Sequence, residues 1–252
     1  MSFVNKTVLI TGASSGIGAA TAIEFAKNGA NVAIVGRNVE KLQRVAEECT
    51  KNGPKPLLIK ADISVDEEAK KMVAEVIKLF GKLDVLVNNA GLIYTGSILE
   101  GNILDAYDKT MKVNVRAHIH ITTLSMPHLI QTKGNIINIS SIAGSTATRQ
   151  SGGTPYCVSK AALNHFTRCA AKELASQGVR VNTVSPGPVK TDFLVNAGYP
   201  NMKFEDMAVN LPLKRVSEAV EIADIIMFLA SDKAVGITGS EFLVDNGSLL
   251  TG

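Results

Sequence analysis

A short β-branched run near the start of the chain leads directly into a glycine-rich turn. Residues 7–11 read TVLIT, residues 11–18 read TGASSGIG, and helical spacing follows over residues 17–27. Glycine permits a tight turn and lets an anion approach the backbone. The N-terminus of the following helix offers unpaired N–H groups and partial positive charge to a phosphate. This strand–turn–helix order predicts a dinucleotide-binding βα unit, whose expected cofactor contacts are Gly12, Ser14, Ser15, Gly16, Ile17 and Gly18.

The rest of the chain alternates short apolar runs with longer amphipathic ones. Further strands are expected at residues 32–35, 57–59, 85–87, 135–139, 179–184 and 242–244. Further helices are expected at residues 39–49, 66–79, 104–113, 115–130, 156–175, 204–209 and 218–229. Strands that are apolar at nearly every position are buried on both faces, as in parallel sheets, and alternation with helices indicates βαβ units. The sequence therefore predicts an α/β fold, a doubly wound (Rossmann-type) parallel sheet of about seven strands with helices on both faces, in a single domain over residues 1–252.

Two other glycine motifs fit the same turn less well. Residues 12–16 also match G-x-S-x-G, the nucleophile elbow of α/β-hydrolases. A hydrolase of that fold needs an acidic residue and then a histidine further along the chain, but the last histidine is His165, and the elbow normally follows several strands. The Walker pattern fails because no Gly-Lys-Ser/Thr follows. Dinucleotide binding is therefore favoured.

The turn after the second expected strand indicates which dinucleotide is bound. It reads Gly36-Arg37-Asn38. An NAD site normally carries an acidic residue here that holds the ribose hydroxyls, whereas an arginine accommodates a 2′-phosphate. Arg37 can pair with that phosphate in a charge-assisted contact, and Ser14 and Asn38 can share it; the alternative is that Arg37 is a solvated loop arginine. The missing carboxylate favours NADP(H).

Composition and charge exclude several other classes. Charged residues make up 19% of the chain, the net charge is only +3 and aromatic residues are 5%, so the basic stripe with aromatics that marks a nucleic-acid binder is missing. Cys49, Cys157 and Cys169 are too few and too unpatterned for a disulfide framework or a zinc site, and we expect no metal. With no signal-peptide pattern and no apolar stretch near the ~20 residues that cross a bilayer, we expect a cytoplasmic protein.

Polar residues gather after the fourth and fifth expected strands. They include the Asn-Asn-Ala-Gly turn at 88–91, Asn114 between two expected helices, and the Ser140-Ser141 pair. Ligands of open α/β sheets bind at the carboxyl ends of the strands, so these side chains should line one crevice. Tyr156 and Lys160, four positions apart, share one face of a helix.

An ammonium beside a phenol favours the phenolate. A unit charge at ~4 Å with an effective dielectric constant of ~20 is worth up to about 4 kcal/mol. We therefore expect Lys160 to lower the pKa of Tyr156 toward neutrality, where acid/base catalysis works best. The four histidines carry no comparable signal, because His118 and His120 are two positions apart and do not share a helix face.

Six motifs occur in an order that resembles the short-chain dehydrogenase/reductase family over nearly the full length. They are TGASSGIG at 11–18, NNAG at 88–91, VNV at 113–115, ISSIAG at 139–144, Y-x-x-x-K at 156–160 and SPGPVKT at 185–191. The resemblance implies hydride transfer between NADP(H) and a carbonyl or secondary alcohol. It also implies that Tyr156 is the acid/base, that Ser141 bonds the substrate oxygen, that Lys160 binds the nicotinamide ribose, and that Asn114 holds a water.

The resemblance implies further cofactor contacts at Asp62, Ile63, Asn89, Ala90, Gly91, Pro186, Gly187, Val189 and Thr191, besides Tyr156 and Lys160. One spacing departs from the family pattern, because Ser141 and Tyr156 are fifteen positions apart, more than is usual. We expect the extra length around residues 151–153, where glycine tolerates unusual turns. Ser140 is the alternative to Ser141, and its side chain should point to the opposite face of the strand.

Residues 188–213 predict a lid over the substrate. The apolar residues of this segment are Phe193, Leu194, Tyr199, Met202, Phe204, Met207 and Leu211. An apolar lid favours a lipophilic substrate such as a ketosteroid, an isoprenoid or medium-chain carbonyl, or a 3-oxoacyl group; the alternative is that these residues only pack the segment onto the body. We expect a homo-oligomer, which in similar proteins is most often a tetramer. A second reading is a non-catalytic NADP-binding redox sensor or subunit.

Overall fold

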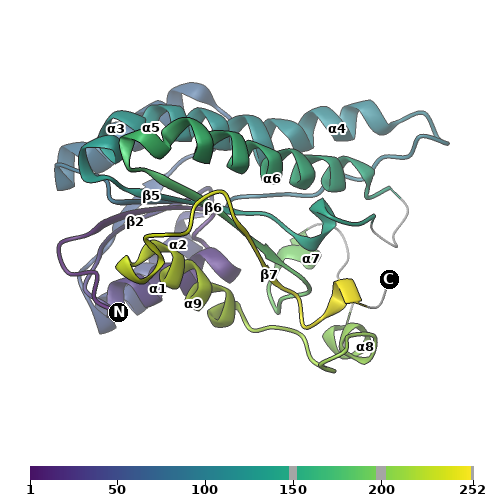
Figure 1. Cartoon of the computed structure of the whole chain (residues 1–252). Helices are drawn as coiled ribbons and strands as arrows, with labels where there is room; N and C mark the ends of the chain where they lie inside the picture. Colours follow the sequence, from purple (N-terminus) through teal and green to yellow (C-terminus); the bar gives the residue numbers. More distant parts are fainter. Residues whose placement is uncertain (148–151, 197–202, 251–252) are drawn as a thin grey trace.

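The parallel strands form one sheet with helices packed on both faces (Figure 1). The computed structural model describes residues 1–147, 152–196 and 203–250. Within them, seven strands pair in the order β3-β2-β1-β4-β5-β6-β7, each parallel to its neighbours. The strands are β1 (Thr7–Thr11), β2 (Asn31–Gly36), β3 (Leu57–Lys60), β4 (Val85–Asn88), β5 (Asn135–Ile139), β6 (Arg180–Pro186) and β7 (Glu241–Val244). The strand order reverses between β1 and β4, and this switch point is where ligands of such sheets bind.

The helices form one layer on each face of the sheet. They are α1 (Gly16–Lys27), α2 (Val39–Asn52), α3 (Asp66–Phe80), α4 (Ile103–Met111), α5 (His118–Thr132), α6 (Thr154–Leu174), α7 (Phe193–Asn196), α8 (Phe204–Val209) and α9 (Ala219–Ala230). Figure 1 shows α3, α5 and α6 above the sheet and α1, α2 and α9 below it. Each layer buries its own apolar cluster, one around Phe25 and Ile226, the other around Met72 and Ile121. The predicted doubly wound sheet is confirmed.

Burial explains why the strands could be found from sequence. Every residue of β1, β4 and β5 is buried, as expected for the centre of a parallel sheet that is covered on both faces. Since both faces are apolar, these strands appear as continuous apolar runs rather than as alternating patterns. Within the described part of the chain, no helix is both long and apolar enough to cross a membrane.

The region around Asn114 differs from the prediction. The expected break between helices at residues 104–113 and 115–130 is absent from the described structure, and α4 continues into α5 through a π-helical turn at Lys112–Ala117. The turn reads KVNVRA, without the glycine or proline that ends a helix. One residue is accommodated by widening the helix instead, a distortion that is frequent at functional sites. Asn114 therefore lies inside a continuous helical run.

Candidate active site

The glycine-rich turn after β1 is held in place by the end of β4. The Asn89 side-chain amide donates to the carbonyl oxygens of Thr11 and Gly12 at 2.9 and 3.1 Å. The Thr11 hydroxyl accepts from the backbone N–H groups of Asn89 and Ala90 at 3.0 and 3.1 Å. These four bonds join the two strands at the switch point, so the predicted contact residue Asn89 acts on the turn itself.

Three glycines shape this turn into a cradle for a phosphate. Gly12 and Gly16 have φ angles of +66° and +56°, which other residues rarely adopt. A Cβ at Gly12 would lie 2.7 Å from the Cα of Ala90, and a Cβ at Gly18 would collide with the carbonyl oxygen of Gly12. The Ser15 side chain makes no capping hydrogen bond to the described residues, which leaves the first N–H groups of α1 for an anion. This backbone fits a dinucleotide pyrophosphate.

Gly36, Arg37 and Asp62 meet beside the end of β2. A Cβ at Gly36 would lie 3.2 Å from the Cβ of Ser14, so the second strand and the glycine-rich turn touch there. The Arg37 Nη1 lies 3.8 Å from the Asp62 Oδ2, with the arginine side chain 73% exposed. Burial raises the pKa of Asp62, but hydrogen bonds from Ser64 and the charge of Arg37 bring it below its usual value. Arg37 is thus largely exposed, and its pairing with Asp62 is long.

Asn38 and Ile63 have structural tasks at the same edge. The Asn38 Oδ1 accepts from the backbone N–H of Lys41 at 2.9 Å and caps α2. Ile63 is 6% exposed and belongs to the core above the sheet. A cofactor contact by Asn38 would therefore use its side-chain amide nitrogen. A contact by Ile63 would use its backbone, because the Ile63 side chain is buried.

Tyr156, Ser141 and Lys160 meet where β5 ends and α6 begins. Tyr156 is 9% exposed, and the Ser141 side chain lies close enough to lower the pKa of its hydroxyl. The Lys160 Nζ lies 5.6 Å from the centre of the Tyr156 ring and donates to the carbonyl oxygen of Ile139 at 2.8 Å. Ser140 faces the other way, since its hydroxyl donates to the carbonyl oxygen of Lys160 at 3.2 Å and is buried. The geometry therefore favours Ser141 over Ser140.

Burial dominates the protonation of this pair. It raises the pKa of Tyr156 to about 12, although the Ser141 side chain acts in the opposite direction. It lowers the pKa of Lys160 to about 8. The prediction that Lys160 brings the pKa of Tyr156 toward neutrality is wrong for this arrangement, because the phenolate would be desolvated and the ammonium is bonded to Ile139. At neutral pH the tyrosine keeps its proton and the lysine keeps its charge.

The buried Lys160 gives a pH dependence of stability that can be measured. Between about pH 8 and the ~10.4 of an exposed lysine, the unfolded chain binds more protons than the folded one. The contribution of Lys160 to the free energy of unfolding therefore rises with pH in this window, by up to about 1.4 kcal/mol per pH unit. Lys160→Met should remove this rise, and Lys172→Met, an exposed position on the same helix, should keep it. Urea unfolding at several pH values between 8 and 10 measures the slopes; equal slopes in wild type and Lys160→Met would contradict the assignment.

Asn114 fixes the loop that follows β4. Its Oδ1 accepts from the backbone N–H of Leu92 at 3.0 Å, and its Nδ2 donates to the carbonyl oxygen of Leu92 at 2.9 Å and to the hydroxyl of Ser159 at 3.0 Å. A Cβ at Gly91 would lie 3.6 Å from both the Asn114 Oδ1 and the Lys160 Nζ. The structure thus brings Asn114, Gly91 and Lys160 together, with the asparagine side chain committed to the loop.

His118 also supports the site, which the sequence reasoning did not find. It is fully buried, and its Nε2 lies 2.8 Å from the carbonyl oxygen of Ala90, to which it must donate. Burial and the charge of Lys160 lower the pKa of His118 to about 3, so the ring is neutral. Its Nδ1 finds no hydrogen-bond partner among the described residues. No local sequence pattern marked His118, because the Ala90 carbonyl that it meets lies 28 positions away in the chain.

The segment after β6 completes the crevice. Gly187 donates its N–H to the carbonyl oxygen of Val244 at 3.0 Å, and Val189 pairs with Ser217. Thr191 lies over the glycine-rich turn, 3.0 Å from where a Cβ at Gly16 would lie. Pro186 ends β6 itself. The segment for which the sequence predicted contacts with the nicotinamide, residues 186–191, therefore crosses the carboxyl edge of the sheet.

The expected lid is described in part. The ring centres of Phe193 and Tyr156 are 6.1 Å apart, and Leu211 is 5% exposed. Tyr199 and Met202 lie outside the described residues, as does residue 151, the first of the expected extra length at 151–153. Gly152, within that stretch, has a φ of +82°.

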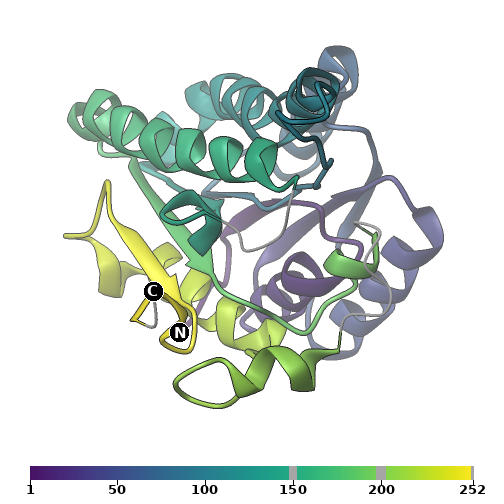
Figure 2. The same cartoon turned by 90° about the vertical axis from the view of Figure 1, so that its right-hand side faces the viewer.

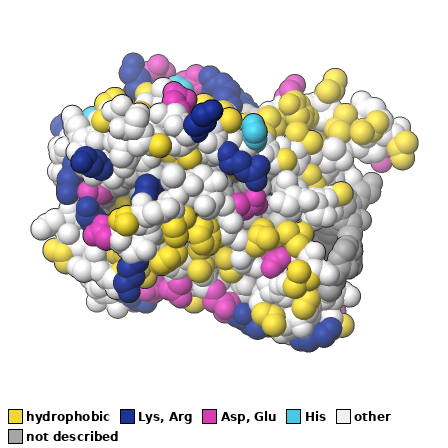
Figure 3. All heavy atoms as spheres, in the orientation of Figure 1, with side chains coloured by type: hydrophobic (Ala, Val, Ile, Leu, Met, Phe, Trp, Pro, Cys, Tyr) yellow, Lys and Arg dark blue, Asp and Glu magenta, His cyan; other side chains and the backbone are white. Residues whose placement is uncertain are grey.

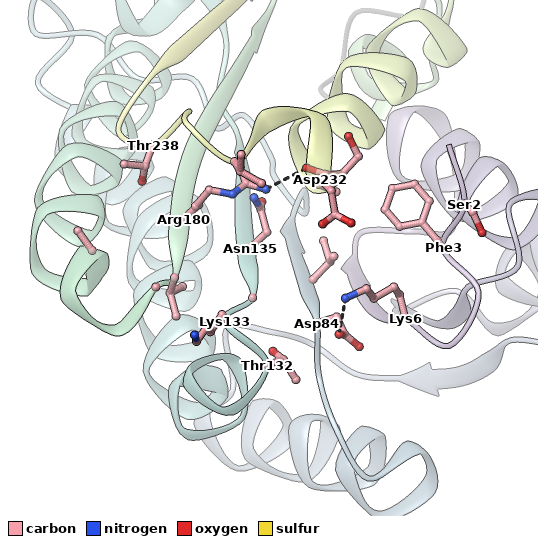
Figure 4. Close-up of a pocket in the computed structure, with 18 residues that line it drawn as sticks. Ser2, Phe3, Lys6, Asp84, Thr132, Lys133, Asn135, Arg180, Asp232 and Thr238 are labelled. Carbon is pink, nitrogen blue, oxygen red and sulfur yellow. Dashed lines mark hydrogen bonds and ion pairs between the residues drawn. The ribbon is translucent and has the colours of Figure 1, made fainter.

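A cavity of about 390 Å³ lies at the opposite edge of the sheet, where β1, β4, β5 and β6 begin. Figure 4 shows Lys6 pointing toward Asp84, and these side chains pair at 3.3 Å. Arg180 donates to the carbonyl oxygen of Leu229 at 2.7 Å. These charges hold chain segments together at an edge far from Tyr156, so the cavity is separate from the candidate active site.

Known proteins resemble this chain over nearly its whole length. A family model described as enoyl-(acyl carrier protein) reductase matches residues 12–248. The chain is 37% identical over 246 residues to the 3-oxoacyl-(acyl-carrier-protein) reductase FabG of Staphylococcus epidermidis, which covers 97% of this chain and 99% of that protein. A short-chain dehydrogenase/reductase of unknown function from Caenorhabditis elegans, solved with cofactor, superposes with a TM-score of 0.93 at 38% identity, over 99% of this chain and 97% of that one. A short-chain dehydrogenase from Burkholderia cenocepacia in complex with NADP gives a TM-score of 0.89 at 32% identity, over 99% and 100%.

Proposed function

This chain belongs to the short-chain dehydrogenase/reductase family, and we propose that it reduces a lipophilic ketone or aldehyde with NADPH, or oxidises the corresponding alcohol. The chain is an oxidoreductase of CH–OH and C=O groups, like its named relatives. The preference for NADP(H) rests on Arg37 and on the absence of an acidic residue at position 36. The single observation that carries the proposal is the cluster at the carboxyl edge of the sheet, in which the buried Tyr156 has the Lys160 Nζ 5.6 Å from its ring centre and Ser141 beside it.

The cofactor, when bound, supplies the hydride, and the chain's residues handle the proton. The raised pKa of Tyr156 keeps its hydroxyl protonated at neutral pH. Tyr156 gives that proton to the carbonyl oxygen as negative charge develops there, and Ser141 donates a hydrogen bond to the same oxygen. Lys160 remains charged and lies 5.6 Å from the phenol ring, so its charge favours the phenolate that results. Asn114 and His118 hold the Leu92 and Ala90 backbone of the adjoining wall.

A panel of carbonyl compounds tests the reaction. With NADPH, we expect ketosteroids, medium-chain ketones or 3-oxoacyl thioesters to cause loss of NADPH absorbance, and sugars of similar reactivity to be poor substrates. A much higher kcat/KM for short hydrophilic sugars would contradict the lipophilic assignment without affecting the reductase assignment.

Apolar side chains around the crevice support the lipophilic substrate. The Phe193 ring lies beside Tyr156. The loop that leaves the site after Gly91 carries exposed apolar residues at Tyr94, Ile98 and Leu99. Figure 3 shows hydrophobic side chains gathered at the upper right, the end of the molecule where α4 begins in Figure 1. A substrate with an acyl or ring system would bury part of this surface beside the reacting carbonyl.

In this proposal, residues 188–213 form a lid over the substrate. The chain works as a homo-oligomer, a tetramer by analogy with its family. A cytoplasmic location stays a prediction. The second candidate function is an NADP-binding redox sensor without turnover, which the clustering of Ser141, Tyr156 and Lys160 disfavours, because a sensor has no need of proton transfer.

A further inference from the structure

An ion pair joins two chain segments that follow distant strands. In the sheet, β2 and β6 are four strand spacings apart, which places their ends roughly 19 Å from each other. Yet Lys41 in α2, directly after β2, has its Nζ 3.0 Å from the Oδ2 of Asp192, which follows β6. The segment after β6 therefore turns back along the carboxyl edge of the sheet and crosses the glycine-rich turn. Figure 2 shows this crossing, from the end of β6 to α7 beside α1.

Lys41 lies close to where the 2′-phosphate of NADPH is expected. It is the third residue of α2, and its backbone N–H is bonded to the capping side chain of Asn38 at 2.9 Å. Side chains of a helix lean toward its N-terminus, which brings the Lys41 ammonium toward the N-terminal end of α2, directly after Arg37 and Asn38 in the chain. The N-terminus of α2 adds partial positive charge at the same place.

Each of the two cations at this edge has a carboxylate as its partner. Arg37 faces Asp62 at 3.8 Å, and Lys41 faces Asp192 at 3.0 Å. The Lys41 and Asp192 side chains are 39% and 58% exposed. Exposed ion pairs between flexible side chains stabilise little, so a phosphate dianion can displace a single carboxylate.

We propose that Lys41 binds the 2′-phosphate of NADPH and that Asp192 competes with the phosphate for this lysine. The inference rests on the proposed NADP(H) preference and adds a residue to it. The ion pair ties the segment after β6 to α2, with Thr191 lying over Gly16. Phosphate binding takes Lys41 from Asp192 and frees this segment from α2. Cofactor binding is thereby coupled to the segment that carries Phe193 to Tyr156.

Calorimetric titration with 2′,5′-ADP and 5′-AMP tests the proposal, because the two probes differ only in the 2′-phosphate. Lys41→Ala should weaken 2′,5′-ADP binding about tenfold and leave the 5′-AMP affinity within about twofold. Asp192→Asn should strengthen 2′,5′-ADP binding about two- to fivefold, again without effect on 5′-AMP. Lys51→Ala is the matched control, since Lys51 lies on the same helix and pairs with Glu48 at 2.6 Å. All titrations use one fixed ionic strength because salt screens these charges.

The outcomes separate this inference from the proposed function. If the wild type binds 2′,5′-ADP much better than 5′-AMP but Lys41→Ala does not change that ratio, Lys41 is not a ligand of the phosphate. If Lys41→Ala weakens both probes equally, the lysine supports only the local structure and the inference is wrong. Weaker 2′,5′-ADP binding by Asp192→Asn would show that Asp192 assists rather than competes. Equal binding of the two probes by the wild type would overturn the NADP(H) preference itself, and this inference with it.

Discussion

Replacing Tyr156 with phenylalanine is expected to lower kcat by at least ~100-fold, the usual scale of acid/base catalysis, while the fold and nucleotide affinity remain. The substitution removes one hydroxyl group and keeps the ring that packs 6.1 Å from Phe193. What is lost is the proton donor beside Ser141. Single-turnover and steady-state rates with NADPH measure the loss of activity. A nucleotide titration measures whether the affinity for the cofactor is retained.

Tyr107→Phe provides the matched control for this prediction. Tyr107 is a partly exposed tyrosine of α4 outside the candidate site, so its hydroxyl can be removed without loss of turnover. Near-normal activity of Tyr156→Phe would remove Tyr156 from the reaction. If the wild type binds NADPH but turns over no carbonyl or alcohol, the redox-sensor reading is favoured instead.

Most of the fold could be predicted because the apolar pattern of each segment matches how deeply that segment is buried. The strands are continuous apolar runs since both faces of the sheet are covered, and the turn after β1 needs glycine where φ is positive. The strand ends then bring the polar residues to one edge, which is why Ser141, Tyr156 and Lys160 could be grouped from sequence. The break predicted around Asn114 is absent because residues 112–117 contain no glycine or proline to end the helix, which continues through a π-helical turn.

The electrostatics of the site could not be predicted in the same way. Helical spacing places Lys160 near Tyr156, but the pKa of each depends on how deeply the pair is buried and on the Ile139 carbonyl that Lys160 meets. His118 was overlooked because its partner, the Ala90 carbonyl, is 28 positions away. The Lys41–Asp192 pair joins residues 151 positions apart. Such contacts follow from how the sheet brings loops together, not from any local pattern.

Reversal of coenzyme preference toward NADH is expected when Gly36→Asp is combined with Arg37→Ala. A charge-assisted hydrogen bond is worth roughly 1.5–3 kcal/mol, so loss of the Arg37 contact should reduce the preference for NADPH about 10- to 150-fold. The new carboxylate would repel the 2′-phosphate and accept the two ribose hydroxyls of NADH. Lys41 and Ser14 remain near the phosphate, so Arg37→Ala alone should weaken the preference without reversing it.

The structure also defines the control for this prediction. A Cβ at Gly36 would lie 3.2 Å from the Cβ of Ser14 and 3.4 Å from the Cδ2 of Leu42, so any side chain there needs a shift of a few tenths of an ångström. Gly36→Ala introduces the same crowding without a charge, and it should retain the preference for NADPH. The measurement is kcat/KM for both coenzymes at one ionic strength, because salt weakens phosphate contacts. If the wild type already uses NADH better than NADPH, Arg37 is a bystander paired with Asp62, and the reductase assignment stands without it.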